Sequence, residues 1–207
     1  MIKNRNDLKL YLDQDKKALR IKKRQGVSNF LFELFFPNDI WKFEKILRYT
    51  EYYNNVSASN FLFKCWKMLF LLYYKYKLRK ISIKLGFHIP INVFGPGLSI
   101  AHRGTIVVNS HSRIGSNCRL HTCVNVGASA GVKEAPHIGD NVYIGPGAII
   151  FGDIRIANNV TIGANATVNC SCEKERVVLA GTPANIVKEN TRNWLEFNRV
   201  DALLPQP

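Results

Sequence analysis

Two histidines, His102 and His121, are spaced so that they could share one chemical task. Imidazole has the side-chain pKa closest to neutrality, so a histidine can take a proton from a hydroxyl group at ordinary pH. His121 follows His102 by 19 residues. Whether the two rings meet depends on the period with which the surrounding backbone repeats.

An aliphatic side chain recurs at every sixth position in the second half of the chain. The ten positions are Ile114, Leu120, Val126, Val132, Ile138, Ile144, Ile150, Ile156, Ile162 and Val168. A helix repeats every 3.6 residues and a strand every two, so neither produces this period. A triangular coil does, because three sides of about six residues close one turn of about 18. His102 and His121 are then about one coil apart, on the same edge.

Asparagine is expected to form corners of this coil, because it tolerates turn conformations that bulkier residues resist. The corner asparagines are Asn117, Asn141, Asn159 and Asn165.

Residues 1–84 have the apolar spacing of helices instead. Two groups show it: Phe30, Leu31, Leu34 and Phe35, then Ile40, Phe43 and Ile46. Asn38 and Asp39 predict a helix start, and Ser57 or Ser59 is expected to cap the aromatic helix that follows. We therefore predict a basic α-helical domain (1–84), a coil domain (85–189), and a C-terminal helix and tail (190–207) that caps the open end of the coil stack.

The basic charge of the chain is concentrated in the predicted helices. The net charge is +14, and residues 1–84 carry 19 basic and 7 acidic side chains. Such a surface favours anionic partners, and Lys75, Lys77, Arg79 and Lys80 directly follow an aromatic stretch, so peripheral contact with the inner face of a membrane is one expectation. Lysines interrupt that stretch, residues 61–74, which is too short to span a bilayer. No nucleic-acid-binding module is recognisable, so no nucleic acid is expected as a partner.

The five cysteines have no metal-ligand spacing and are interpreted as reduced thiols of a cytoplasmic protein. The polar, charged first residues do not resemble a signal peptide.

The coil domain resembles the serine O-acetyltransferases and the related O-acetyltransferases of capsule and surface-polysaccharide clusters. The segments that carry the resemblance, in the family's order, are 95–108, 117–131, 138–154, 162–168 and 179–187. The resemblance implies a left-handed parallel β-helix, acetyl-CoA as acetyl donor without a metal, and a homotrimer that could pair into a hexamer through residues 1–84.

The resemblance also assigns residues. The histidine of the segment matching Ile100, Ala101 and His102 is the family's catalytic base, so His102 inherits that role. Acetyl-CoA in the family lies along a groove between subunits, touching small residues of successive coils. The matching positions are Ala128, Gly145, Pro146, Gly163 and Ala164. These residues are also what any β-helix uses at its corners.

Several family positions are replaced here. The Asp directly before the catalytic His is Ala101, and an Asp one coil earlier aligns with Phe87. The Arg and His that read serine's carboxylate and ammonium are replaced by Glu134 and Ala135. We therefore expect a sugar hydroxyl of a surface polysaccharide as the acceptor, with L-serine as the alternative. His121 and Glu134 are candidate substrate contacts or helpers of His102.

Two further alternatives belong to other classes. One is a non-catalytic β-helix scaffold that binds a membrane or a partner through its basic helices, although the intact segment around His102 argues against it. The other is a β-helix metalloenzyme of the carbonic anhydrase type, which would need three neighbouring histidines. His102 and His137 have a suggestive separation, but Val142 occupies the place where the third histidine would follow.

Overall fold

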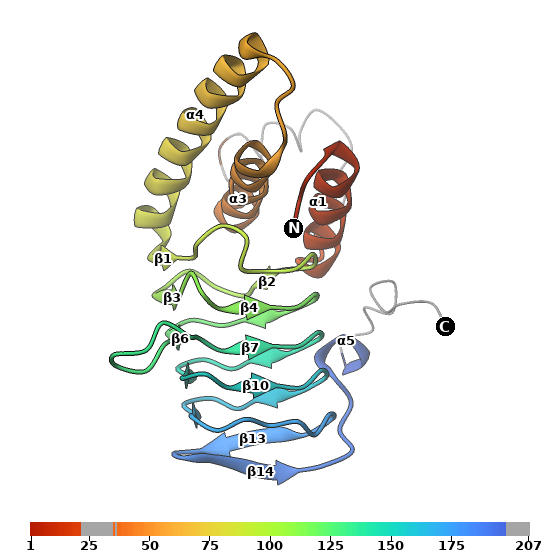
Figure 1. Ribbon diagram of the computed structural model, residues 1–207. Coiled ribbons are helices and arrows are strands. Elements are labelled where there is room, and N and C mark those ends of the chain that lie inside the picture. Colours follow the sequence, from red (N-terminus) through yellow and green to blue (C-terminus); the bar gives the residue numbers. More distant parts are fainter. Residues whose placement is uncertain (22–34, 36, 198–207) are drawn as a thin grey trace.

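The computed structural model describes residues 1–21, 35 and 37–197, with helices stacked on one end of a coil of short strands (Figure 1). The helices are α1 (Arg5–Ala18), α3 (Asp39–Asn55) and α4 (Phe61–Leu85). Asn38 caps α3 as predicted. The cap of α4 is Asn60, not Ser57 or Ser59, because the Asn60 side chain accepts a hydrogen bond from the Phe63 N–H at 2.8 Å. The helical pattern predicted at Phe30, Leu31, Leu34 and Phe35 falls mainly outside the described residues.

Each turn of the coil places one short strand on each of three faces. The first face holds β1 (Phe87–His88), β3 (Ile106–Val108), β6 (Val124–Gly127), β9 (Ile149–Phe151) and β12 (Thr167–Val168). The second holds β4 (Arg113–Ile114), β7 (His137–Ile138) and β10 (Arg155–Ile156). The third holds β2 (Ser99–Ile100), β5 (Arg119–Leu120), β8 (Tyr143–Ile144), β11 (Thr161–Ile162), β13 (Val178–Gly181) and β14 (Ala184–Lys188).

The aliphatic positions of the repeat fill the inside of this triangle. Nine of the ten predicted positions are buried, and the pairing of Leu120 with Ile144 and of Ile144 with Ile162 stacks equivalent side chains from coil to coil. Val132 is the exception, with 46% of its surface exposed. The prediction is wrong there because residues 128–136 leave the coil as a loop between β6 and β7, visible as a protrusion in Figure 1.

The corner asparagines adopt the left-handed conformation that the coil requires. Asn117, Asn141, Asn159 and Asn165 all have φ between 55° and 60°. Three of them also form a ladder along one edge, with Asn117 donating to Asn141 and Asn141 donating to Asn159, both at 3.0 Å. The predicted corners are confirmed, and the ladder ties consecutive coils together.

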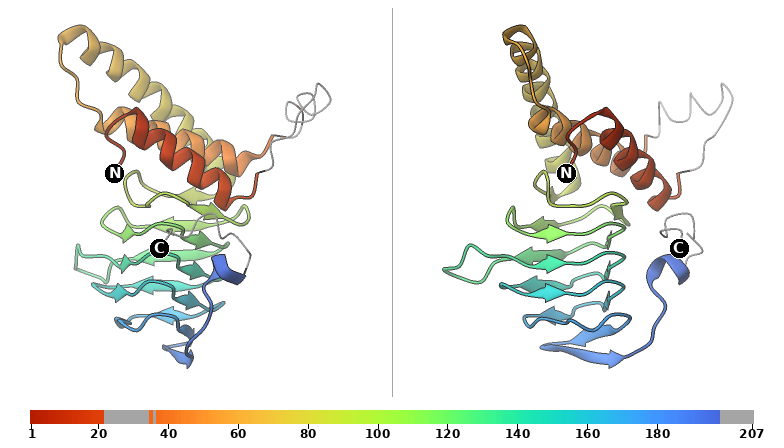
Figure 2. Two further views of the ribbon diagram at one scale, coloured as in Figure 1. Left: turned by 90° about the vertical axis from the view of Figure 1, so that its right-hand side faces the viewer. Right: turned by 45° about the vertical axis from the view of Figure 1, so that its right-hand side comes forward.

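The described part of the C-terminal segment, up to residue 197, lies beside the coil and not at its open end, where the cap was predicted. Strand β14 pairs antiparallel with β13 at the last coil. The short helix α5 (Trp194–Phe197) instead lies beside the coil (Figure 2), where the Trp194 indole N–H donates to the Asn117 carbonyl at 2.8 Å. A buried indole seeks such an acceptor, and this bond holds the segment alongside earlier coils.

A buried arginine joins the helices to the coil. Arg48 is fully buried, and its partners are Asp15 (2.7 Å), Glu51 (3.0 Å) and the carbonyls of Phe94 (3.0 Å) and Gly95 (2.7 Å). Burial lowers the pKa of the guanidinium, but Asp15 and Glu51 together outweigh burial and raise it, so Arg48 remains charged. Asp15 also accepts from the backbone N–H groups of Gly97 and Leu98. The network fixes α1 and α3 on the first coil.

Glu44 lies in the same interface and makes folding stability depend on pH. Burial, and then the charge of Asp15, raise its pKa well above the usual value, against the lowering effect of Arg48. The folded state therefore keeps a proton that the unfolded state releases, and stability falls as pH rises above about 4.5. As the pH rises, we expect the free energy of unfolding of Glu44→Gln to increase relative to that of the native chain, by at most about 1.4 kcal/mol per pH unit.

Urea unfolding of both chains at several pH values checks this prediction. The amide that replaces the carboxyl in Glu44→Gln keeps an oxygen for the Ile100 N–H, which bonds Glu44 at 3.3 Å. Groups other than residue 44 titrate in both chains, so the difference isolates this carboxyl. A stability difference that does not change with pH would contradict the assignment.

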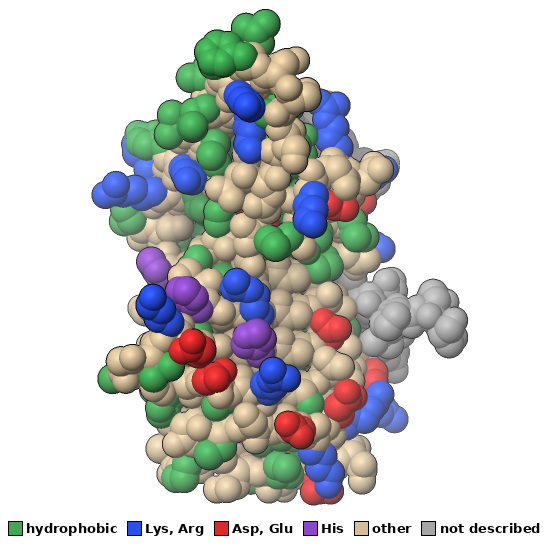
Figure 3. All heavy atoms as spheres, in the orientation of Figure 1, with side chains coloured by type: hydrophobic (Ala, Val, Ile, Leu, Met, Phe, Trp, Pro, Cys, Tyr) green, Lys and Arg blue, Asp and Glu red, His purple; other side chains and the backbone are tan. Residues whose placement is uncertain are grey.

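The exposed apolar side chains of α4 gather at the end of the molecule farthest from β14 (Figure 3). Within the described residues, no helix is both long and apolar enough to cross a membrane.

Candidate active site

His102 lies at the corner between the third and first faces, directly after β2. Its side chain is exposed. Hydrogen bonds from Ala101 N–H to the Leu120 carbonyl (2.9 Å) and from Gly104 N–H to the Leu85 carbonyl (3.1 Å) hold the corner to the next coil and to the end of α4. The imidazole is therefore carried by a fixed backbone but remains open to a substrate.

His121 occupies the same corner one coil further on, as the spacing predicted. Its ring centroid is 5.8 Å from that of His102 and 5.0 Å from that of Tyr143. Burial, then the charges of Arg119 and His102, lower the pKa of His121, so its ring is neutral near pH 7. Its Nε2 atom is buried and has no partner within the described part of the chain. A neutral imidazole offers one donor and one acceptor, so His121 can bond a group that enters the corner.

The third face also carries Arg119 and Tyr143, both close to His121. Arg119 donates to the Ser99 hydroxyl at 2.8 Å and lies over the Trp194 ring, and Ser99 donates to the Ala18 carbonyl. Sequence reasoning did not find Tyr143 or Arg119. Counting coils could have found Tyr143, which pairs with Arg119 in register, but the loop at 128–136 lengthens that coil.

The residues expected to contact acetyl-CoA divide between two corners. Gly145, Pro146, Gly163 and Ala164 lie on successive coils below His121, at the corner after β8 and β11. Ala128 lies elsewhere, after β6, where the first face turns into the second. A Cβ atom on Gly145 would approach the backbone of Gly163 and Ala164 to within 2.9 Å, so coil packing alone already requires glycine there.

Glu134 and Ala135 also lie away from His102. Both belong to the 128–136 loop at the corner between the first and second faces; Glu134 is exposed and Ala135 is buried at 2% exposure. Phe87, another replaced family position, packs edge-on against Phe43 with ring centroids 5.0 Å apart. It serves the core between the helices and the coil.

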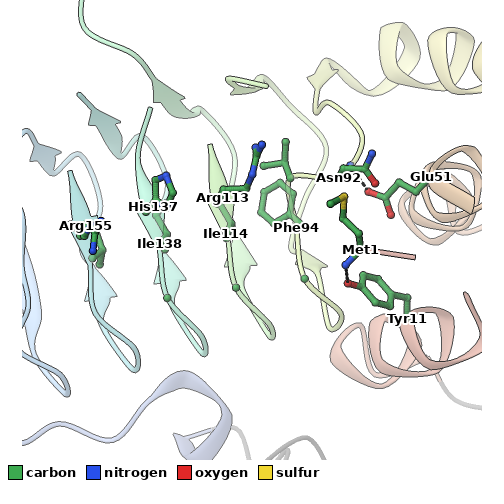
Figure 4. Close-up of a pocket in the computed structure, with 15 residues that line it drawn as sticks. Met1, Tyr11, Glu51, Asn92, Phe94, Arg113, Ile114, His137, Ile138 and Arg155 are labelled. Carbon is green, nitrogen blue, oxygen red and sulfur yellow. Dashed lines mark hydrogen bonds between the residues drawn. The ribbon is translucent and has the colours of Figure 1, made fainter. Parts of the chain in front are cut away.

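A separate groove lies on the second face (Figure 4). Arg113, His137 and Arg155 stand side by side in strand register along it, and Tyr11 and Glu51 close its helical end. None of the predicted site residues lines this groove. Among the described residues, no three His, Cys, Asp or Glu side chains are grouped as metal ligands.

Comparison with known proteins supports the fold and redirects the functional interpretation. Residues 135–170 match the family described as bacterial transferase hexapeptide (six repeats). The serine acetyltransferase of Staphylococcus xylosus is 39% identical over 100 residues, which are 47% of this chain and 46% of that protein. The enzyme of the same name from Staphylococcus aureus strain Mu50 is 38% identical over 98 residues, 46% of each chain. The chain thus spans about half the length of the curated relatives it matches.

Solved structures have the same fold. The serine acetyltransferase of Neisseria gonorrhoeae superposes with a TM-score of 0.66 at 21% identity, covering 92% of this chain and 70% of that one. The soybean enzyme complexed with serine gives 0.65 at 23% identity, covering 88% and 70%. A serine acetyltransferase complexed with CoA gives 0.61 at 24% identity, covering 88% and 71%. The expected fold, a left-handed parallel β-helix preceded by helices, is confirmed.

The expectation of a sugar acceptor is wrong. These curated relatives and structural neighbours are serine acetyltransferases, and the expected closeness to capsule enzymes is not supported. Glu134 and Ala135 lie at a different corner from His102, so within one chain these replaced positions are not beside that imidazole.

Proposed function

We propose that this protein transfers an acetyl group from acetyl-CoA to the side-chain hydroxyl of L-serine. The observation that carries the proposal is the exposed His102 beside His121, whose buried Nε2 lacks a partner in the described structure. The serine acetyltransferases at 38–39% identity supply the reaction class and the acceptor.

In the proposed reaction, His102 accepts the hydroxyl proton of serine as the oxygen attacks the thioester carbonyl. The C–O bond forms, the tetrahedral intermediate collapses, and the C–S bond breaks. The departing CoA thiolate takes the proton back from His102, so the products are O-acetylserine and CoA. His102 ends in the protonation state in which it began.

His121 is proposed to replace the orienting role of the missing acidic residue. Phe87 stands where the resemblance places the Asp that orients the catalytic His, so no carboxylate from that position can hold the imidazole tautomer. The neutral ring of His121, whose centroid is 5.8 Å from that of His102, would take part in positioning that imidazole without adding charge.

The proposed catalytic unit is a homotrimer in a reducing, cytoplasmic compartment. Ala128 and Glu134 are at a different corner from His102, so they would have to reach its surroundings from a neighbouring copy. A second copy would thereby complete the acetyl-CoA groove begun by Gly145 and Gly163. All five cysteines are free thiols, as expected where glutathione keeps them reduced.

Product analysis by mass spectrometry tests the function. Purified protein with carbon-13-labelled acetyl-CoA and L-serine is expected to form labelled O-acetylserine and an equal amount of CoA. L-alanine, which lacks only the hydroxyl, is the matched control and should accept no label. Absence of O-acetylserine from a folded, trimeric preparation would refute the proposal.

A further inference from the structure

Helix α4 continues beyond the helix against which it packs (Figures 1 and 2). Along most of its length one side contacts α3, with Tyr74 stacked on Tyr49 and Phe70 stacked on Tyr53 at centroid distances of 5.1 and 5.2 Å. Lys67 reaches back to the Val56 carbonyl at 2.6 Å, just past the end of α3. Residues 61–66 are exposed on every side of the helix.

The free end of α4 is strongly apolar. The large apolar side chains there that are more than half exposed are Phe61 (76%), Leu62 (80%), Trp66 (54%), Met68 (55%), Leu69 (65%) and Leu72 (57%). In Figure 3 apolar side chains gather at this end of the molecule. A contiguous apolar patch of this kind marks a surface that meets another apolar phase.

The rest of α4 is basic, and the order of side chains along the helix is informative. Residues 73–85 contain five Lys or Arg, a further two, Lys64 and Lys67, lie in the apolar end, and Phe61–Leu85 contains no Asp or Glu. After the apolar end come Tyr73 and Tyr76, each with a lysine ammonium 4.9 Å from its ring, and then the exposed Arg79. Apolar, then aromatic, then cationic is the order in which side chains meet acyl chains, the interface and anionic headgroups.

We propose that α4 binds the surface of an anionic phospholipid membrane. The apolar end, residues 61–72, enters the boundary between headgroups and acyl chains, and the cations that follow, Lys75, Lys77, Arg79 and Lys80, contact lipid phosphates. The charge of α4 favours an anionic membrane over a second copy of the chain as its partner. In a symmetric contact between two α4 helices, each copy would bring the same cations and no anion, and like charges would oppose each other.

Vesicle co-sedimentation tests the proposal with the full chain. Binding is expected to vesicles containing phosphatidylglycerol, not to pure phosphatidylcholine, and to weaken at high salt. Leu62→Glu/Leu69→Glu should abolish binding. The matched control is Ile186→Glu/Val187→Glu, which adds the same charge at exposed apolar residues of β14 and should bind normally. Lys75→Gln/Arg79→Gln should weaken partitioning on the order of 10-fold.

The contrary outcomes are distinct. A native chain that stays in the supernatant with anionic vesicles, or binds neutral vesicles equally well, overturns the proposal. If it binds no vesicles, and Leu62→Glu/Leu69→Glu only lowers the oligomer mass in light scattering, the surface is a contact between copies. Circular dichroism establishes that each variant is folded. The assay needs no acetyl transfer, so its outcome is separate from that of the proposed function.

Discussion

Replacing His102 with alanine is expected to lower kcat for the proposed acetyl transfer to L-serine by roughly 10²–10⁴-fold, the usual contribution of a general base. The serine hydroxyl then attacks the thioester without a partner to remove its proton. Because the side chain is exposed at a corner that backbone hydrogen bonds hold, the substitution should leave the fold intact. Initial rates at saturating acetyl-CoA and L-serine measure the effect.

His111→Ala is the matched control, since His111 is an exposed histidine in the turn between β3 and β4. It should retain the native rate. If His102→Ala remained active while His121→Ala lost activity, the base would have to be assigned to His121. If both substitutions had equally small effects on the rate, the hypothesis that a histidine at this corner is the catalytic base would be wrong.

The second large effect concerns stability. Arg48→Met is expected to lower the free energy of unfolding by about 3–5 kcal/mol, because it leaves two carboxylates buried without a cation. Asp15 is 0% exposed and Glu51 is 2% exposed, and the guanidinium also satisfies two backbone carbonyls of the first coil. Urea unfolding followed by circular dichroism gives the difference.

Lys84→Met is the comparison for that experiment. Lys84 also pairs with a carboxylate, Asp39, at 2.7 Å, but its side chain is 61% exposed, so its loss should cost at most about 1 kcal/mol. Should Arg48→Met fail to fold, Arg48→Lys keeps the charge but not the fork of donors, and we expect an intermediate loss. A loss for Arg48→Met no larger than for Lys84→Met would show that the buried network does not hold the two parts together.

The sequence by itself determined the coil. Aliphatic residues at every sixth position, together with asparagines that accept a left-handed backbone, have one simple packing solution, the triangular coil. Both features can be read from residues close together in the sequence. The spacing of His102 and His121 followed from that period, and so did their contact. Asn38 likewise signalled the start of α3 through a bond that spans only three residues.

Only the tertiary structure decided what depends on contacts distant in sequence. Val132 fits the repeat yet lies in a loop, because a period cannot show where the chain leaves the coil. The Trp194 bond to Asn117 spans 77 residues and sets α5 beside the coil. The partners of Arg48 come from both sides of an interface, and no interval in the sequence encodes them. The faces on which Glu134 and Tyr143 lie were likewise settled by the inserted loop. Leu120 pairs with Ile144 whereas Ile144 pairs with Ile162, so the coil that holds the loop is six residues longer and each later six-residue segment lies one face further on.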